Sequence, residues 1–179
     1  MKKVHALLLL AAPLVACSGA VDAGNAPTPA RTLTIPHYAH SAPLDGIEAE
    51  VLRLTNKVRA SGATCGDVAM PPVPLLSMND QLRDAAIWHS ADMAARSYFD
   101  HNAPEGDDAG VRITAARYTY RTWGENIARN FMDPEAVVRA WVASPGHCHN
   151  LMTASFRELG VGVVESDLGR VWTQNFASR

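Results

Sequence analysis

The residues best suited to chemistry gather in one short segment, 144–149, where a serine, two histidines and a cysteine follow one another closely (SPGHCH). Ser144 could act as a nucleophile beside His147, and Cys148 could join the imidazoles as a metal ligand or act as a thiol nucleophile. The spacing favours none of these, because the chain contains no HExxH, GxSxG, CxxC or HxxxH pattern. Ser-Pro-Gly is typical of a turn, and we assign His149 to the surface.

The start of the chain has the pattern of an export signal. Two lysines precede an apolar run, residues 4–15, that is shorter than the roughly 20 residues a membrane-spanning helix needs. The run ends at LVAC (14–17), which resembles the lipobox of bacterial lipoproteins, whose cysteine is acylated and becomes the new N-terminus. We therefore predict a lipoprotein-type signal peptide over 1–16 and lipid attachment at Cys17. The alternative is an ordinary signal peptide cut near Ala20.

The charge balance excludes two classes of partner. Removal of the two lysines in 1–16 leaves 14 basic and 18 acidic residues, a net charge of −4 with histidine neutral. No basic stripe remains for nucleic acid, and no polybasic segment for anionic lipid head groups. We expect the lipid itself to anchor the protein to the membrane, outside the cytoplasm. In a Gram-negative cell the protein would lie in the outer membrane or face the periplasm.

A tether follows the predicted lipidation site. Residues 18–43 are rich in Ala, Pro, Thr and Gly and hold few bulky apolar side chains. Such a segment buries too little surface to offset its conformational entropy, so we predict a lipidated flexible tether over 17–43. His37 and His40 are interpreted as solvated linker residues. The remaining residues, 44–179, suffice for one domain with one core, which we expect to be monomeric.

Two cysteines remain once Cys17 is acylated, an even number in an exported chain. We predict that Cys65 and Cys148 form a disulfide that closes a long loop and holds the segment carrying His147. On the chain-entropy model such a loop closure contributes about 4–5 kcal/mol. A mixed Cys/His metal site is the alternative, but the usual ligand spacing is absent.

Apolar periodicity predicts three helices ahead of the last strands. The first spans 45–62, with Asp45 and Glu48 as a capping box. The second runs from Ser77 to near Tyr98 and carries His89 on its apolar side, where we interpret it as a packed core histidine. The third begins at Asp133-Pro134 and ends at Pro145-Gly146.

Strand-like patterns close the chain. Residues 159–165 and 171–176 read as an antiparallel hairpin around a turn at 167–169, and 101–121 reads as a polar, exposed loop. Helices followed by strands, without βαβ alternation, indicate an α+β layered fold. The four tryptophans are interpreted as core residues: Trp88, Trp123, Trp141 and Trp172.

Four segments in order along the chain carry a family resemblance: HSADMAARSYFDH (89–101), WGENIA (123–128), WVASPGHCHNLM (141–152) and the closing ELGVGVV…VWTQNFA. Together they resemble the CAP superfamily, the cysteine-rich secretory, antigen 5 and pathogenesis-related-1 proteins. The SPGH and WTQ forms are similar to its bacterial branch. The resemblance implies a three-layer α-β-α sandwich with a small central antiparallel sheet, which agrees with the α+β pattern.

The resemblance also implies a cleft, because two His and two Glu converge in that family. Three of those positions match His101, Glu125 and His147, whereas Ser144 stands where the second Glu usually lies. The three residues could bind a divalent metal such as zinc, with the carboxylate as a ligand or orienting a His through its second nitrogen. They could equally form a hydrogen-bonded polar cluster. Asn126 is expected to fix the loop after the Gly of the GEN motif.

We place a binding function first, because the set of four residues is incomplete. It would be a lipid-anchored module of the cell envelope whose cleft takes a small apolar molecule, an envelope component or a metal. The resemblance implies this, since some relatives bind sterols or lipids and others act as extracellular signals or toxins. The second hypothesis is a metal-dependent hydrolase of an envelope or extracellular substrate, with Glu125 as general base toward water on a metal held by His101 and His147. The third is a structural or adhesive surface domain.

Overall fold

The computed structural model describes residues 32–37, 46–167 and 169–179. The signal peptide, Cys17, His40, Asp45 and most of the predicted tether lie outside the described residues. The elements, in chain order, are α1 (Ile47–Ser61), β1 (Ala63–Cys65), β2 (Val68–Met70), β3 (Ser77–Met78), α2 (Asp80–Arg96), α3 (Ala109–Ala115), β4 (Thr122–Arg129), α4 (Pro134–Ala143), α5 (Pro145–Met152), β5 (Glu158–Val164) and β6 (Val171–Ser178).

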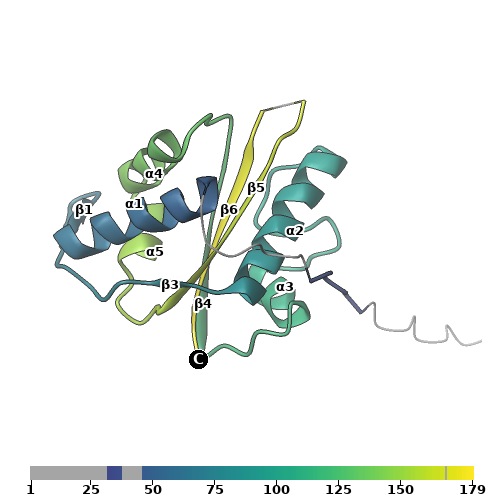
Figure 1. The fold of residues 1–179 in the computed structure, drawn as a ribbon, viewed down its shortest axis with the longest axis horizontal. Coiled ribbons are helices and arrows are strands. Elements are labelled where there is room, and N and C mark those ends of the chain that lie inside the picture. The colour runs from purple at the N-terminus through teal and green to yellow at the C-terminus, as the bar shows by residue number, and fades with distance from the viewer. Residues whose placement is uncertain (1–31, 38–45, 168) are drawn as a thin grey trace, which may run out of the picture. The chain divides into compact units, whose positions relative to one another are not determined.

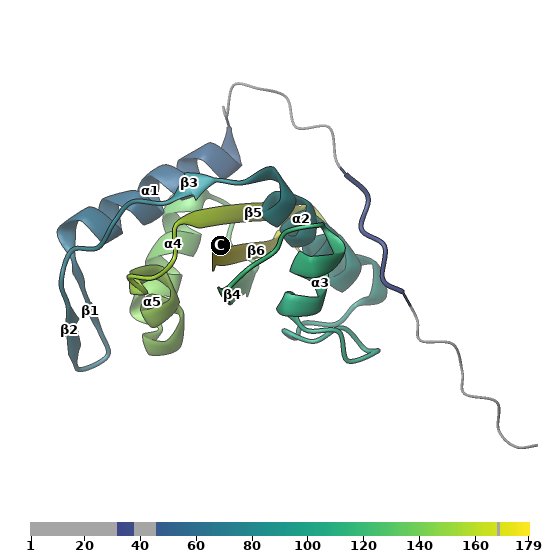
Figure 2. The same cartoon turned by 90° about the horizontal axis from the view of Figure 1, so that it is seen from below.

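A four-stranded sheet with the order β3-β5-β6-β4 forms the middle layer. β5 and β6 pair as the predicted antiparallel hairpin, β4 adds to β6 in antiparallel register, and the short β3 pairs parallel with β5. Helices α2 and α3 lie on one side of the sheet, and α1, α4 and α5 lie on the other (Figures 1 and 2). The predicted three-layer α-β-α sandwich is confirmed, and β4 is an outer strand of its sheet.

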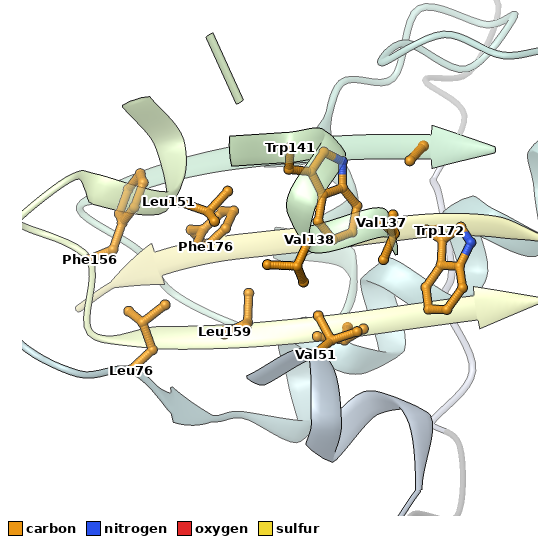
Figure 3. Packing of buried hydrophobic residues seen from close by; sticks show 12 residues of the cluster. Val51, Leu76, Val137, Val138, Trp141, Leu151, Phe156, Leu159, Trp172 and Phe176 are labelled. Atoms are coloured by element: carbon orange, nitrogen blue, oxygen red, sulfur yellow. The ribbon is translucent and has the colours of Figure 1, made fainter. Parts of the chain in front are cut away.

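The larger apolar core fills the space between the sheet and α1, α4 and α5 (Figure 3). Its buried side chains include Val51, Val137, Val138, Trp141, Leu151, Leu159, Trp172 and Phe176. Trp141 and Trp172 are 1% and 0% exposed, whereas Trp88 and Trp123 are partly buried against a second core cluster beside α2 and α3. The assignment of the tryptophans to packing is therefore confirmed.

Glycines on β5 allow α2 to lie directly on the sheet. A Cβ at Gly160 would lie 2.0 Å from the backbone carbon of Leu82, and one at Gly162 would lie 2.3 Å from that of Ala86. Any side chain at either position would push the helix away, because both obstacles are backbone. The alternation of glycine with apolar residues in β5 thus sets how closely α2, which carries His89, approaches the sheet.

Side-chain caps fix the starts of three helices. Asn79, Asp108 and Asp133 accept hydrogen bonds from the backbone N–H groups of Leu82, Val111 and Ala136, as expected of N-cap residues. Of the capping box predicted for the first helix, Asp45 lies outside the described residues; the structure has Gly46 as the N-cap, and no described side chain caps it. Glu48 instead forms an ion pair with Arg83 of α2.

Several elements differ from the sequence-based expectation, among them the unpredicted β1 and β2, and β3, which occupies Ser77, the predicted start of the second helix; that helix begins at Asp80. β4 follows residues read as a loop, and its pattern is hidden because Gly124–Ala128 are buried in succession instead of alternating. α3, with seven residues, is too short to show a helical period. Pro145 does not end the helical region. It lies in the first turn of α5, where a backbone N–H has no partner within the helix, so its absence in proline loses no hydrogen bond.

Residues 32–37, part of the predicted tether, contact the domain. Ile35 is 8% exposed and belongs to the core cluster of α2 and α3. The side chain of His37 is 74% exposed, yet its Nδ1 lies 2.6 Å from Oδ2 of Asp84. Among the described residues, no helix has both the length and the apolar character needed to cross a membrane.

Candidate functional site

The three residues expected in a cleft lie along β4. Glu125 is on this strand, His101 is on the loop between α2 and α3, and His147 is on α5. Glu125 faces the α2 and α3 side of the sheet, while the neighbouring Asn126 bonds to α5 on the other side. The site therefore extends across the outer strand of the sheet and draws one imidazole from each helical layer.

Glu125 is buried and hydrogen-bonded at both carboxylate oxygens. Oε1 lies 2.9 Å from Nδ1 of His101, and Oε2 accepts a bond from Nη2 of Arg112 at 2.8 Å. With its amide turned to satisfy both partners, Asn175 also donates to Oε2 at 3.1 Å and accepts from the N–H of Ala86. The side chains of Glu125 and Arg112 are 2% and 0% exposed, so this is a buried ion pair of the kind that needs further hydrogen bonds.

Arg112 links this carboxylate to the loop that carries His101. Its guanidinium donates to the carbonyl oxygens of Asp107 and His101 at 2.6 and 2.9 Å. Its Nε is buried without a hydrogen-bond partner among the described residues. Arg112 thereby fixes both the backbone and, through Glu125, the ring of His101.

The contact with Glu125 sets the protonation and orientation of His101. The hydrogen bond to the carboxylate raises the pKa of His101 above its ordinary value of 6.5, although partial burial opposes the shift. The imidazole is 52% exposed. Because Nδ1 is bonded to Glu125, Nε2 is the nitrogen that would meet a ligand in the cleft.

His89, on α2, lies next to Glu125 and is fully buried. Burial lowers its pKa to about 4, so the ring is neutral at pH 7 although it lies 3.8 Å from Oε1 of Glu125. Its Nε2 lies 3.1 Å from the carbonyl oxygen of Asp100, which identifies Nε2 as the donor. The interpretation of His89 as a packed, hydrogen-bonded core histidine is confirmed.

Amide side chains hold the segment that carries His147. Nδ2 of Asn126 donates to the carbonyl oxygen of His147 at 3.2 Å, and Asn150 donates to Oδ1 of Asn126 and to the carbonyl of Glu125. Asn126 also bonds to Gln174, which donates to Thr55 of α1. Asn126 thus has a positioning role, as expected, but it acts on α5 and not on the loop after Gly124.

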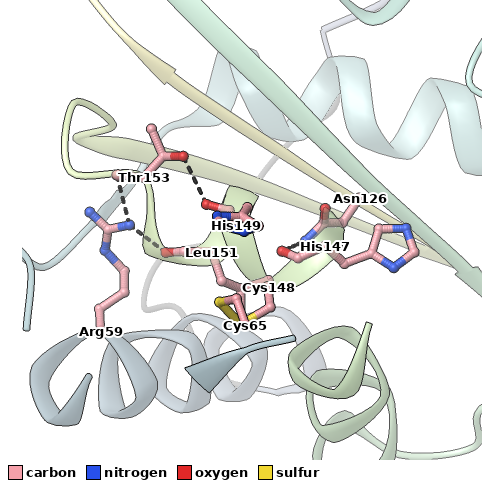
Figure 4. Close-up of a disulfide and its surroundings, with 8 residues drawn as sticks. All are labelled: Arg59, Cys65, Asn126, His147, Cys148, His149, Leu151 and Thr153. Carbon is pink, nitrogen blue, oxygen red and sulfur yellow. Dashed lines mark hydrogen bonds between the residues drawn. A yellow bond between two sulfur atoms is a disulfide. The ribbon is translucent and has the colours of Figure 1, made fainter. Parts of the chain in front are cut away.

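The predicted disulfide is confirmed and lies at the same helix. Cys65 and Cys148 are bonded, with their Cα atoms 5.3 Å apart and a sequence separation of 83. Figure 4 shows the imidazole of His147 pointing away from the disulfide. Burial, with a smaller contribution from His101, lowers the pKa of His147. His149 is exposed, as expected.

A buried arginine holds the far end of α5. Arg59 donates to the carbonyl oxygens of Leu151 and Thr153 at 2.5 and 3.1 Å (Figure 4) and to that of Phe156. Carbonyls at the C-terminus of a helix carry partial negative charge, so the cation is satisfied without a carboxylate. Burial nevertheless lowers the pKa of Arg59 to about 10.

Two hollows open along β4. The first, of about 310 Å³, is lined by His101, Glu125, Asp108 and Asn150 among others, and we name it the imidazole hollow. The second, of about 300 Å³, is lined by His147, Ser144 and Arg129 together with apolar side chains, and we name it the apolar hollow. The predicted cleft thus has two parts of different chemistry, with one histidine in each.

The donor set does not fit a metal centre of the usual kind. Catalytic zinc sites commonly use three protein ligands. The part of the chain that the structure describes contains no group of three or more His, Cys, Asp or Glu placed to hold a metal. Glu125 orients His101 through Nδ1, and Arg112 and Asn175 occupy its other oxygen. His101 and His147 would supply at most two ligands.

Neither Arg112 nor Asn175 could be identified as a site residue from the sequence. Arg112 lies in residues read as an exposed loop, and a single arginine there has no pattern to distinguish it from a surface charge. Asn175 lies on β6, in the closing segment quoted for the resemblance, and only its pairing opposite Glu125 shows its role. The resemblance identified which residues line the cleft, whereas their partners required the structure.

The sequence matches the family described as the cysteine-rich secretory protein family, CAP, over residues 52–176. It is 34% identical over 157 residues to the Bacillus subtilis protein YkwD, described as uncharacterized, covering 88% of this chain and 56% of that protein. An extracellular protein of Bacillus anthracis that contains an SCP domain has a similar structure, with TM-score 0.65, 32% identity and coverage of 78% and 45% of the two chains. An outer surface protein of Borrelia burgdorferi has TM-score 0.58 at 19% identity, covering 73% and 88%.

The chain therefore spans only about half the length of YkwD and a third of a second B. subtilis relative, the membrane protein YlbC, of which 34% is covered at 30% identity. The similarity concerns the domain and does not carry over what the longer proteins do as wholes.

Proposed function

The chain belongs to the cysteine-rich secretory protein family, CAP, and from this membership and the geometry of the cleft we propose that it is an extracytoplasmic binding module. Its ligand is held between the imidazoles of His101 and His147, in the two hollows along β4. The protein is anchored to the cell envelope by lipid at Cys17 and acts there as a receptor or carrier for a small molecule or an envelope component.

The state of Glu125 is the observation that carries this proposal. Both its oxygens are engaged, by His101 on one side and by Arg112 and Asn175 on the other, and its side chain is 2% exposed. A general base must reach the proton that it removes, and this carboxylate faces protein donors instead. Its role is to position His101, whose half-exposed ring is left to meet a ligand.

Hydrolysis has less support for the same reason. The proposed general base is buried in an ion pair, and the described residues supply no three-ligand metal centre that could activate water. A purely structural surface domain is also less supported, because such a role gives no reason for an oriented, half-exposed imidazole beside a hollow.

Native mass spectrometry of the protein, purified without chelator, tests the proposal. We expect a co-purified organic ligand, reduced in His101→Ala and in His147→Ala, and no stoichiometric zinc. Calorimetry provides a second readout: the melting temperature of the wild-type protein should be unmoved by added zinc. Stoichiometric zinc that is lost in both variants would instead support a metal centre. The exposed His149→Gln is the matched control, and it should retain the ligand.

The anchor has its own test, because Cys17 lies outside the described residues. Cys17→Ser should move the protein from the detergent phase to the aqueous phase in a detergent partition, or leave the precursor unprocessed, because no acyl chain can be attached. Partition identical to wild type would contradict the proposed lipid anchor and leave the proposal for the cleft unaffected.

A further inference from the structure

The apolar hollow differs from the imidazole hollow in the charge of its walls. Two acidic residues, Asp108 and Glu125, are among those that line the imidazole hollow, and the carboxylate of Glu125 is already paired with Arg112. None of the described residues that line the apolar hollow is acidic. Its permanent charge is the guanidinium of exposed Arg129, which lies 4.9 Å from the ring centre of Phe99. The described lining of the apolar hollow therefore holds a cation and no carboxylate that would repel an anionic ligand group.

The inner wall of the apolar hollow is hydrophobic. Ile127 and Trp141 are 6% and 1% exposed, and Phe131 and Phe99 complete the wall. The indole N–H of Trp141 already donates to the carbonyl oxygen of Ile127 at 3.2 Å, so the ring offers only its apolar surface. A hollow of about 300 Å³ is at the small end of the range for small-molecule sites.

Ser144 lies at the polar edge of this hollow together with His147. By the resemblance to the family, Ser144 also stands where a Glu usually lies. A carboxylate here would place a negative charge in a wall whose other ionisable side chains are those of Arg129 and His147. The serine leaves the electrostatic field of Arg129 unopposed within the hollow.

We propose that the apolar hollow binds the apolar body of a small monocarboxylate, an aryl or short alkyl acid, whose carboxylate pairs with Arg129. Arg129 sets this preference for an anion, and the lack of a carboxylate at position 144 preserves it. The inference rests on the proposed function, because it names the ligand class for one half of the same cleft. An ion pair with a permanently charged guanidinium is the strong form of hydrogen bond available there.

Isothermal titration of the full chain in detergent, with 4-phenylbutyrate and its neutral isostere 4-phenylbutanamide, tests the proposal. The acid should bind about tenfold more tightly than the amide, the effect of one charge-assisted hydrogen bond. Arg129→Gln should reduce the acid to the affinity of the amide. Ser144→Glu should weaken the acid about tenfold, whereas Ser144→Gln, of similar size, should leave the preference for the acid in place.

A second apolar groove provides the matched control. It has a volume of about 430 Å³ and lies between α1, α4 and β1, and its charged lining residues are Lys57, exposed Arg139 and Glu135. If the probe binds at the apolar hollow, Arg139→Gln has no effect. Loss of the preference in Arg139→Gln and not in Arg129→Gln would overturn the assignment, as would equal affinity of the wild-type protein for acid and amide.

These outcomes are distinguishable from failure of the proposed function. A protein that co-purifies no ligand but binds the probe through Arg129 would contradict the proposed receptor or carrier role and keep this site. A protein that co-purifies a ligand insensitive to Arg129→Gln, and shows no acid preference, would keep the binding function and exclude a monocarboxylate.

Discussion

The two histidines of the cleft are positioned by different kinds of interaction. His101 depends on charge, through the buried pair of Glu125 and Arg112. His147 depends on a disulfide at the next residue and on neutral amides. A buried ion pair is sensitive to the loss of one partner and to pH, whereas a cross-link is sensitive to reductant. The two halves of one site should therefore fail under different conditions.

Removal of the disulfide should have the largest effect. Cys65→Ser with Cys148→Ser should lower the free energy of unfolding by about 4–5 kcal/mol, because the closed loop no longer restricts the unfolded chain. Urea denaturation measures the loss. Amide hydrogen exchange should increase in α5 before it increases in α3. Equal loosening of both helices would show that the two halves are not held independently.

Arg112→Met should destabilise the charged half by about 3–5 kcal/mol, because the carboxylate of Glu125 would remain buried without its cation. The matched control is the double variant Arg112→Met with Glu125→Gln, which leaves no unpaired buried charge. It should recover much of the loss in the same urea titration. A double variant no more stable than the single one would argue against the ion pair as the source of the effect.

Acid should weaken the protein through His89. Its folded pKa of about 4 lies below its ordinary value of 6.5, so between these values the unfolded chain binds a proton that the folded protein does not. Stability is therefore full above pH 6.5 and falls by up to about 1.4 kcal/mol per pH unit toward pH 4. The lowered pKa of His147 acts in the same direction.

Thermal unfolding from pH 4 to 8 checks the acid effect. His89→Gln should flatten the dependence between pH 4 and 6.5, and the exposed His149→Gln should leave it unchanged. His101 acts with the opposite sign, because its folded pKa is raised. Its contribution is complete below pH 6.5 and is lost as pH rises through the folded pKa. Stability that stays constant below pH 6.5 would contradict a neutral, buried His89.

Asn126→Ala should have the smallest effect, about 1–3 kcal/mol, because it leaves the carbonyl of His147 and the amides of Asn150 and Gln174 with fewer partners. Chemical denaturation compares it with Asn102→Ala, an exposed asparagine whose replacement should cost less than about 0.5 kcal/mol. If both cost the same, the amide network does not stabilise α5.

Helix starts and strand alternation could be predicted because their signals lie in neighbouring residues, and the disulfide could be predicted because only two cysteines remained to pair. Asp133-Pro134 marked the start of α4, the apolar alternation marked the β5–β6 hairpin, and two remaining cysteines implied the disulfide. The strand β4 could not be predicted, because Glu125 and Asn126 are buried polar residues that break the apolar pattern, and α3 could not because it is too short to show a helical period. Such residues are stable inside only with partners that come from distant segments.

The sequence by itself determined the layered α+β class and, through the family resemblance, predicted the two imidazoles and the carboxylate of the cleft and the serine in place of a Glu. Only the tertiary structure decided which groups contact them. It paired Glu125 with Arg112 and Asn175, so that the carboxylate orients His101, and it placed the two imidazoles in hollows with different lining residues. The reason is that a carboxylate takes its role from its donors, and these donors lie 13 and 50 residues away along the chain.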